Sequence, residues 1–199
     1  MSSSILNRRP SPRLGRRTLA ASASVAAVSV AMLLFAGPAF SFTAHVYSSS
    51  FTGSGTDALS QPTGIAVDSS AGGEGDVYVA DTANHRVEKF TASGEFILMF
   101  GKEVNRTAVE AHGTEVEEDV CTNASGDECQ TGTSSSAPGG FETPQFVAVD
   151  SSSGQSARDV YVGDSRRVGE IGAVSKFDSS GHLISTWGTG GRQSITGGS

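Results

Sequence analysis

Four aspartates each follow directly on a short apolar segment: Asp68, Asp81, Asp150 and Asp164. Carboxylates at such places could bind calcium, which prefers oxygen ligands, or they could accept hydrogen bonds from the backbone N–H groups of a turn. The chain has no Asp-x-Asp-x-Asp-Gly run of the kind found in calcium loops. The pattern therefore favours a structural role in turns for all four.

Polar residues also cluster where each half of the chain would turn between strands. Asn84, His85 and Arg86 stand at this place in the first half, and Arg166 and Arg167 stand at the corresponding place in the second. Turns over a rigid scaffold are a common position for binding residues. We therefore interpret these five residues as a candidate surface for an extracellular protein or glycan. For Asn84 and His85 taken alone, hydrogen bonds that form the turn are the favoured interpretation.

No residue pattern predicts a catalytic group, a bound metal or a cofactor. The serines lie in turn-like clusters without a Gly-x-Ser-x-Gly motif, and the glycine-rich runs carry acidic residues where a phosphate cradle would carry lysine. His45, His112 and His182 share no spacing that is typical of a metal site.

The chain begins with a basic and then apolar segment that is typical of an export signal. Five arginines precede an uncharged run over residues 18–44, which a Gly-Pro pair interrupts. Small residues at the −3 and −1 positions fit cleavage after Ala39 or after Ser41. We therefore predict a signal peptide at residues 1–41 and a secreted or cell-surface protein. The alternative is a membrane anchor over residues 18–44, because that run is long enough to span a bilayer.

The part that follows the signal is strongly acidic. It carries nine Lys and Arg against 21 Asp and Glu, a net charge of −12. A surface of this sign repels phosphate backbones, so nucleic acid is not a predicted partner. Both cysteines, Cys121 and Cys129, lie in this part. Export to an oxidising compartment favours a disulfide between them over two free thiols.

One stretch of sequence occurs twice. Residues 61–68, 76–81 and 89–90 recur as residues 143–150, 159–164 and 176–177, with a Gly/Ser-rich gap in each copy. Self-similarity over a unit of about 40 residues indicates a repeat architecture, in which each unit buries its apolar face against a neighbour.

Short apolar or alternating segments between turn residues predict four strands in each copy. In the first copy these are residues 64–67, 77–79, 86–90 and 96–100, and in the second they are residues 147–149, 160–162, 173–177 and 183–187. Four short strands joined by tight turns form an antiparallel meander. The large aromatic residues recur at equivalent strand positions, which favours a core between the two units over an exposed stacking platform.

Two segments lie outside the copies. Residues 103–140 hold eight acidic residues against Arg106 alone and show no sustained apolar period, so we predict a long surface loop, fixed by the cysteine pair and otherwise mobile. A short helix within residues 109–120 is a weaker expectation. Residues 45–51 precede the first copy and read as a single strand, which could complete the sheet of another unit and close a ring.

The copies resemble the NHL repeat family. The first matches it at Pro-x-Gly-Ile-Ala-Val-Asp from Pro62, at Asp-Val-Tyr-Val-Ala-Asp from Asp76, and at Asn-His-Arg-Val from Asn84, where Arg86 replaces the family's Leu. The second departs from the family, because Phe146 replaces the Gly of the first motif and Ser-Arg-Arg-Val replaces the Asn-His stretch.

The resemblance implies an all-β fold of the β-propeller type, usually with six blades. This chain would supply two four-stranded antiparallel meanders and one N-terminal latch strand, an incomplete propeller. We therefore expect a partial propeller over residues 42–199, with one blade at 53–102, the acidic insertion at 103–140 and a second blade at 141–191. Two blades do not close a ring. The remaining blades would then belong to a longer protein, or less simply to further copies of the chain.

The resemblance also implies two classes of function. The first is an exported, non-catalytic module that binds a protein or glycan partner. The second is a propeller enzyme of the lyase or lactonase type, with a divalent metal in the central channel. A lyase of this fold needs channel histidines from several blades, whereas the second copy has Ser165-Arg166 where the first has Asn84-His85. The binding module is therefore the favoured interpretation.

Overall fold

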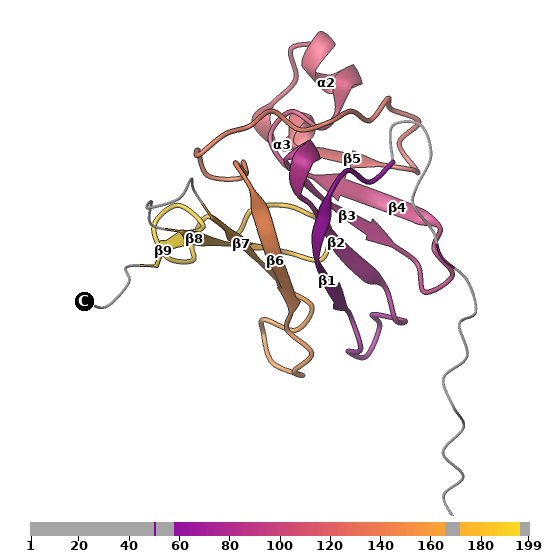
Figure 1. Ribbon diagram of the computed structural model, residues 1–199, viewed down its shortest axis with the longest axis vertical. Helices are drawn as coiled ribbons and strands as arrows, with labels where there is room; N and C mark the ends of the chain where they lie inside the picture. Colours follow the sequence, from indigo (N-terminus) through magenta and orange to yellow (C-terminus); the bar gives the residue numbers. More distant parts are fainter. Residues whose placement is uncertain (1–49, 51–57, 166–171, 196–199) are drawn as a thin grey trace, which may run out of the picture. The chain divides into compact units, whose positions relative to one another are not determined.

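A computed structural model of the chain describes residue 50, residues 58–165 and residues 172–195 (Figure 1). Every described residue belongs to one compact unit, Ser49–Ser199. The predicted signal, the predicted latch strand at residues 45–51 except residue 50, and the Arg166–Arg167 pair lie outside the described residues. Within the described part, no helix has the length and apolar character needed to cross a membrane.

The first repeat forms an antiparallel sheet in the strand order β1-β2-β3-β4-β5. The first four strands are the predicted ones: β1 (Pro62–Val67), β2 (Val77–Asp81), β3 (Arg86–Phe90) and β4 (Phe96–Phe100). A short 3-10 turn, η2 (Thr82–Asn84), joins β2 to β3 and ends at His85, whose backbone is left-handed with φ of 51°. The alternation in the sequence therefore predicts this meander correctly.

The second repeat forms a four-stranded antiparallel sheet, β6-β7-β8-β9. Its strands are β6 (Pro144–Val149), β7 (Val160–Asp164), β8 (Ala173–Phe177) and β9 (Arg192–Ser194). The prediction of the last strand at residues 183–187 was wrong. Leu183 makes a single bridge to Phe177, the chain then leaves the sheet as a turn, and pairing with β8 resumes at Arg192. Glycines with positive φ at 188, 190 and 191 allow this excursion.

Residues 103–140 were predicted to be a surface loop with a short helix within residues 109–120. They contain two short helices, the second of them inside that range, and the fifth strand of the first sheet. These are α2 (Arg106–Glu110), α3 (Glu115–Glu118) and β5 (Val120–Thr122), which pairs with β4. Asn105 caps α2, and Thr114 and Glu117 form a capping box on α3. The segment also has its own small core, in which Val104, Cys121 and Cys129 pack on Met99. We refer to it below as the insertion.

The predicted disulfide between Cys121 and Cys129 is present. Both cysteines are buried, and the loop that they close follows β5 directly. Replacing both by alanine should lower the free energy of unfolding by about 2–3 kcal/mol, because a loop of this length is then free to expand in the unfolded chain. Urea unfolding of the variant would measure the loss. Dithiothreitol should destabilise the wild type similarly and leave the variant unchanged; equal stability of oxidised and reduced wild type would contradict the prediction.

The main core lies between the two sheets. Tyr78, Val87 and Phe100 from the first sheet face Val160, Val162 and Phe177 from the second, and Phe141, in the segment before β6, completes the layer. The rings of Phe100 and Phe177 are 4.7 Å apart between centroids. Phe100 and Phe177 were among the aromatics predicted to fill this layer, whereas Phe141 was not.

The two repeats meet most closely along their first strands, β1 and β6, which lie side by side (Figure 1). Gly64 makes the approach possible, because a Cβ there would lie 2.5 Å from the carbonyl oxygen of Gln145. Its counterpart in the second repeat is Phe146, which lies on the outer face of the second sheet and is 68% exposed. Two antiparallel meanders that pack face to face, with apolar side chains left exposed on the outer faces, constitute an incomplete β-propeller.

Candidate binding site

The turn that joins β2 to β3 is held by a buried ion-pair network. Arg86 donates from Nε to Asp81 at 3.0 Å and contacts Glu88 through Nη2 at 2.5 Å, and all three side chains are fully buried. Asp81 also accepts hydrogen bonds from the backbone N–H of Ser60 and from the Asn84 amide. Arg86 was predicted to face a partner. In the structure the Arg86 side chain has no exposed surface, and two neighbouring carboxylates compensate its charge inside the sheet.

His85 connects the two repeats. Its left-handed backbone ends η2, and its Nδ1 lies 2.7 Å from the carbonyl oxygen of Glu142, just before β6. The insertion passes beside the same turn, since the N–H of Gly132 donates to the carbonyl of Asn84 and Arg86 Nη1 donates to that of Gln130. Asn84 and His85 thus make contacts within the fold. Arg166 and Arg167, the other members of the predicted surface, lie outside the described residues.

Asp164 has the same place in the second repeat but takes its arginine from elsewhere. Its carboxylate accepts hydrogen bonds from the backbone N–H groups of Glu142 and Thr143, as Asp81 does from Ser60. In the first sheet Asp81 stands opposite Arg86, whereas in the second Asp164 stands opposite Ala173. The guanidinium comes instead from Arg192 of β9, whose Nη2 lies 3.2 Å from the Asp164 carboxylate. Each aspartate therefore ties the end of the second strand to the start of the first.

A lysine, a tyrosine and an aspartate form a second repeated cluster, which sequence reasoning missed. Lys89 Nζ lies 3.0 Å from Asp76 and 5.2 Å from the ring centre of Tyr78. In the second repeat, Lys176 Nζ lies 2.8 Å from Asp159 and 5.3 Å from the ring centre of Tyr161. The signal was present, because all these positions are duplicated. An ion pair combined with a cation–π contact explains why both copies keep a lysine in the third strand.

Asp68 follows β1 and Asp150 follows β6, and each forms the turn at that end of the strand. Each accepts a hydrogen bond from the backbone N–H two residues further on, in Ser70 and Ser152. Asp68 is also buried and pairs with Arg158 of the other repeat at 3.1 Å. Burial alone would raise the pKa of Asp68, but the hydrogen bonds from Ser70 and the Arg158 guanidinium outweigh it and lower that pKa below its usual value.

This lowered pKa predicts a pH-dependent link between the repeats. The folded state keeps Asp68 ionised at a pH where the same carboxyl group of the unfolded chain is already protonated. Its contribution to the free energy of unfolding is therefore complete above the unfolded pKa of about 3.9 and is lost as pH falls through the lower pKa of the folded state. The stability difference between wild type and Asp68→Asn should therefore be large at neutral pH and shrink toward pH 2. Urea unfolding at several pH values would test this. Asp150→Asn, without an arginine partner, is the matched control and should show the smaller effect; equal pH profiles would contradict the prediction.

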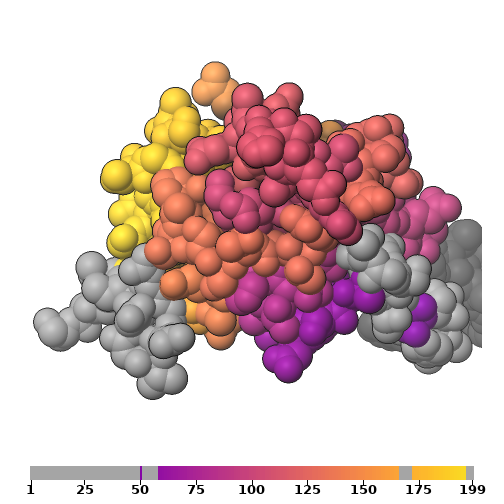
Figure 2. Space-filling model, turned by 90° about the horizontal axis from the view of Figure 1, so that it is seen from above, coloured from indigo at the N-terminus to yellow at the C-terminus, as the bar shows by residue number. Residues whose placement is uncertain are grey.

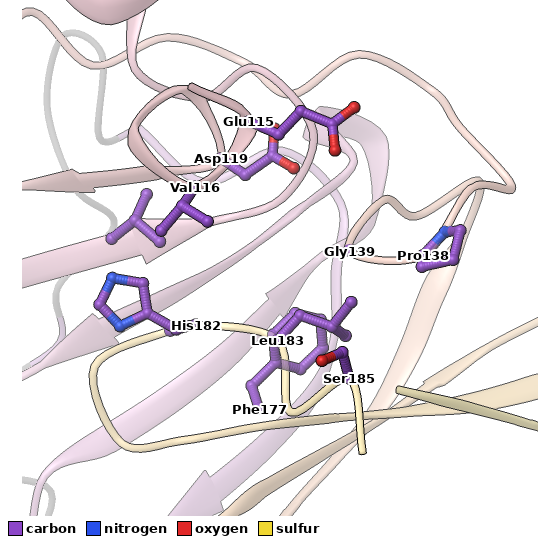
Figure 3. Close-up of a pocket in the computed structure, with 11 residues that line it drawn as sticks. Glu115, Val116, Asp119, Pro138, Gly139, Phe177, His182, Leu183 and Ser185 are labelled. Carbon is purple, nitrogen blue, oxygen red and sulfur yellow. The ribbon is translucent and has the colours of Figure 1, made fainter. Parts of the chain in front are cut away.

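A cleft with a volume of about 210 Å³ lies between the insertion and the turn after β8 (Figure 3). Phe177, Leu183 and Val120 supply apolar surface, while Glu115 and Asp119 approach from α3 and its C-terminal end. His182 stands on the opposite side from these carboxylates. The cleft was not predicted from the sequence, because its walls come from two separate segments, residues 115–139 and residues 177–185.

The acidic side of the cleft is only partly neutralised. Lys102 Nζ lies 3.5 Å from Asp119 and 3.7 Å from Glu115, so one ammonium group serves two carboxylates. Burial raises the pKa of Asp119, while the hydrogen bond from the Glu103 N–H and the charge of Lys102 lower it in part. The Glu115 side chain is 88% exposed and points its charge to the solvent. A group that enters the cleft therefore meets apolar surface below and negative charge at the edge.

Comparison with known proteins agrees with the architecture. Residues 59–90, which extend from the segment before β1 to the end of β3, match the family model described as NHL repeat. No curated protein matches the chain. Among the described residues, no group of three or more His, Cys, Asp and Glu side chains is placed to hold a metal ion. The family match and the two antiparallel sheets together identify a chain that carries an NHL repeat in a β-propeller-type module.

Proposed function

We propose that this chain is an exported, non-catalytic NHL-type module that binds an extracellular protein. The observation that carries the proposal is the cleft between α3 and the turn after β8, because it combines an apolar floor with charged edges on a rigid β scaffold. The insertion that forms one wall is anchored by the disulfide, by its own small core and by its pairing with β4. A wall held in this way is ordered before any partner arrives, which lowers the entropy lost on binding.

Export is supported by the basic and then apolar leader and by the disulfide. Expression in a secreting host, followed by N-terminal sequencing of the released protein, tests this part of the proposal. We expect the mature chain to begin at Phe40 or Phe42, directly after Ala39 or Ser41. Recovery of an intact N-terminus in the membrane fraction would favour the anchor over the signal.

A protein partner is favoured over a glycan by the chemistry of the floor. Sugars bind by stacking on the faces of exposed aromatic rings, whereas Phe177, which supplies the phenyl ring of this cleft, is 2% exposed and packs against Phe100 and Phe141. Aliphatic surface from Leu183 and Val116 is available instead, and it suits an apolar side chain of another protein.

A substitution that fills the cleft tests the function. Ser185 lines the cleft and is exposed, so Ser185→Trp should block entry without disturbing the core. Ser153→Trp, in the exposed turn between β6 and β7, is the matched control. Arrays of extracellular proteins and of glycans would be probed with the mature wild type and both variants. The proposal expects a protein ligand that is lost with Ser185→Trp and kept with Ser153→Trp; ligands indifferent to Ser185→Trp, or glycan ligands alone, would overturn it.

A further inference from the structure

The cleft is one end of a longer groove. A second and shallower hollow of about 450 Å³ follows α2 and α3 along the insertion, and it shares Val116, Val120 and His182 with the cleft. Figure 2 looks onto this side of the molecule and shows the insertion at the centre of the surface, next to the C-terminal segment. A single extended ligand could therefore occupy both hollows.

The floor of the groove is apolar where the two hollows meet. Val116 stands at the junction and is 61% exposed, one of few large apolar side chains that the described fold leaves in solvent. Ala108 and Ala111 continue the apolar surface into the second hollow, and Leu183 continues it into the cleft. Burial of such surface by a ligand contributes about 25 cal/mol per Å² before the entropy lost on association is counted.

The rim of the groove is negative. Four carboxylates line it: Glu115, Glu117, Asp119 and Asp127. His182 is the one side chain of a basic type among the described residues that line the groove. Glu117 is engaged in the capping box and Asp127 accepts from the Asn105 amide, but a hydrogen bond leaves the charge of a carboxylate in place. Lys102 offsets one of these four charges, because its ammonium group serves Glu115 and Asp119 together. Arg106 does not offset the remainder, because it is already paired with Glu110 and Glu128. The field at the groove therefore attracts a cation.

We propose that the groove binds an amphipathic segment of the protein partner in which lysine or arginine alternates with aliphatic side chains. The aliphatic side chains rest on Val116 and Leu183, and the cationic ones reach Glu115 and its neighbours at the rim. This inference rests on the proposed function, since it names the chemistry of the partner at the same site. Complementary charge at the rim speeds and orients the encounter, while apolar burial at the floor holds the complex.

The test uses a short synthetic peptide of alternating lysine and leucine as the probe, with the mature protein. One control peptide carries glutamate for lysine and another carries serine for leucine. Glu115→Lys should weaken binding of the probe about tenfold, and Val116→Ser should weaken it by a similar factor. Glu95→Lys and Ile195→Ser are the matched controls, because these two residues are exposed and do not line the groove. Binding of the probe should also weaken as salt is added.

The outcomes separate this inference from the function on which it rests. Equal binding of the probe and either control peptide, or equal binding by Glu115→Lys and Glu95→Lys, would overturn the inference. If Ser185→Trp still abolished binding of an array protein in that case, the binding module would stand with a different partner chemistry. If no array protein depended on Ser185, the function itself would fail, whatever the peptide did.

Discussion

Arg86→Ala will lower the free energy of unfolding by about 3–5 kcal/mol, the range expected when one partner of a buried ion pair is removed. Arg86 is fully buried between Asp81 and Glu88. Its Nε lies 3.0 Å from Asp81 Oδ2, and its Nη2 lies 2.5 Å from Glu88 Oε1. Its guanidinium also donates to the carbonyl groups of Ala58 and Gln130. Truncation leaves two carboxylates facing each other away from water, and it releases the turn that carries Asn84 and His85. Urea unfolding of the mature protein measures the loss.

Two further variants show why the loss arises. Arg192→Ala removes the corresponding guanidinium in the second sheet, but Arg192 is more exposed and Asp164 keeps its bonds from Glu142 and Thr143, so the loss should be smaller. Arg86→Met combined with Glu88→Leu replaces most of the buried charge by apolar volume and should recover part of the stability. An Arg86→Ala variant within about 0.5 kcal/mol of the wild type, the range of a neutral surface change, would show that Arg86 is not buried as described.

Arg86 also illustrates what the sequence could not predict. An arginine at the start of a strand beside a turn is usually exposed. The burial of Arg86 depends on Asp81 and Glu88 pointing to the same side of the sheet. That condition becomes visible only with the register of β2 against β3, in which Asp81 stands opposite Arg86. The strands themselves could be predicted, because their alternation is a local property of the chain.

The insertion was misjudged for a related reason. Its small core joins Val104, Cys121 and Cys129 to Met99 of β4, and these residues are too far apart in sequence to give a local apolar period. In the second repeat, Leu183 and Trp187 suggested a strand. Leu183 instead packs on the core, and Trp187 meets the Tyr161 ring edge to face with 5.7 Å between the ring centres. Apolar residues in a turn can thus imitate a strand. The cleft was missed because it is formed by these two misjudged segments together.

Phe100→Ala should also lower the free energy of unfolding by about 3–5 kcal/mol, because the sheets are joined by one aromatic layer. Phe100 is fully buried, with its ring centre 4.7 Å from that of Phe177 and 6.3 Å from that of Phe141. It also packs against Gly181, in the turn after β8. The three rings come from both repeats and from the segment before β6, so the loss of Phe100 weakens both repeats at once. Thermal and urea unfolding measure the effect.

The matched control is Phe146→Ala, on the outer face of the second sheet. Phe146 is 68% exposed, so its removal should change stability by less than about 0.5 kcal/mol. Hydrogen exchange adds a spatial test, since Phe100→Ala should raise exchange in both β4 and β8 if the layer holds the repeats together. If the two variants lost equal stability, or if exchange rose in β4 alone, each sheet would be stable by itself. The two repeats would then be independent units, and the cleft between the insertion and the second sheet would lack the rigid scaffold that binding requires.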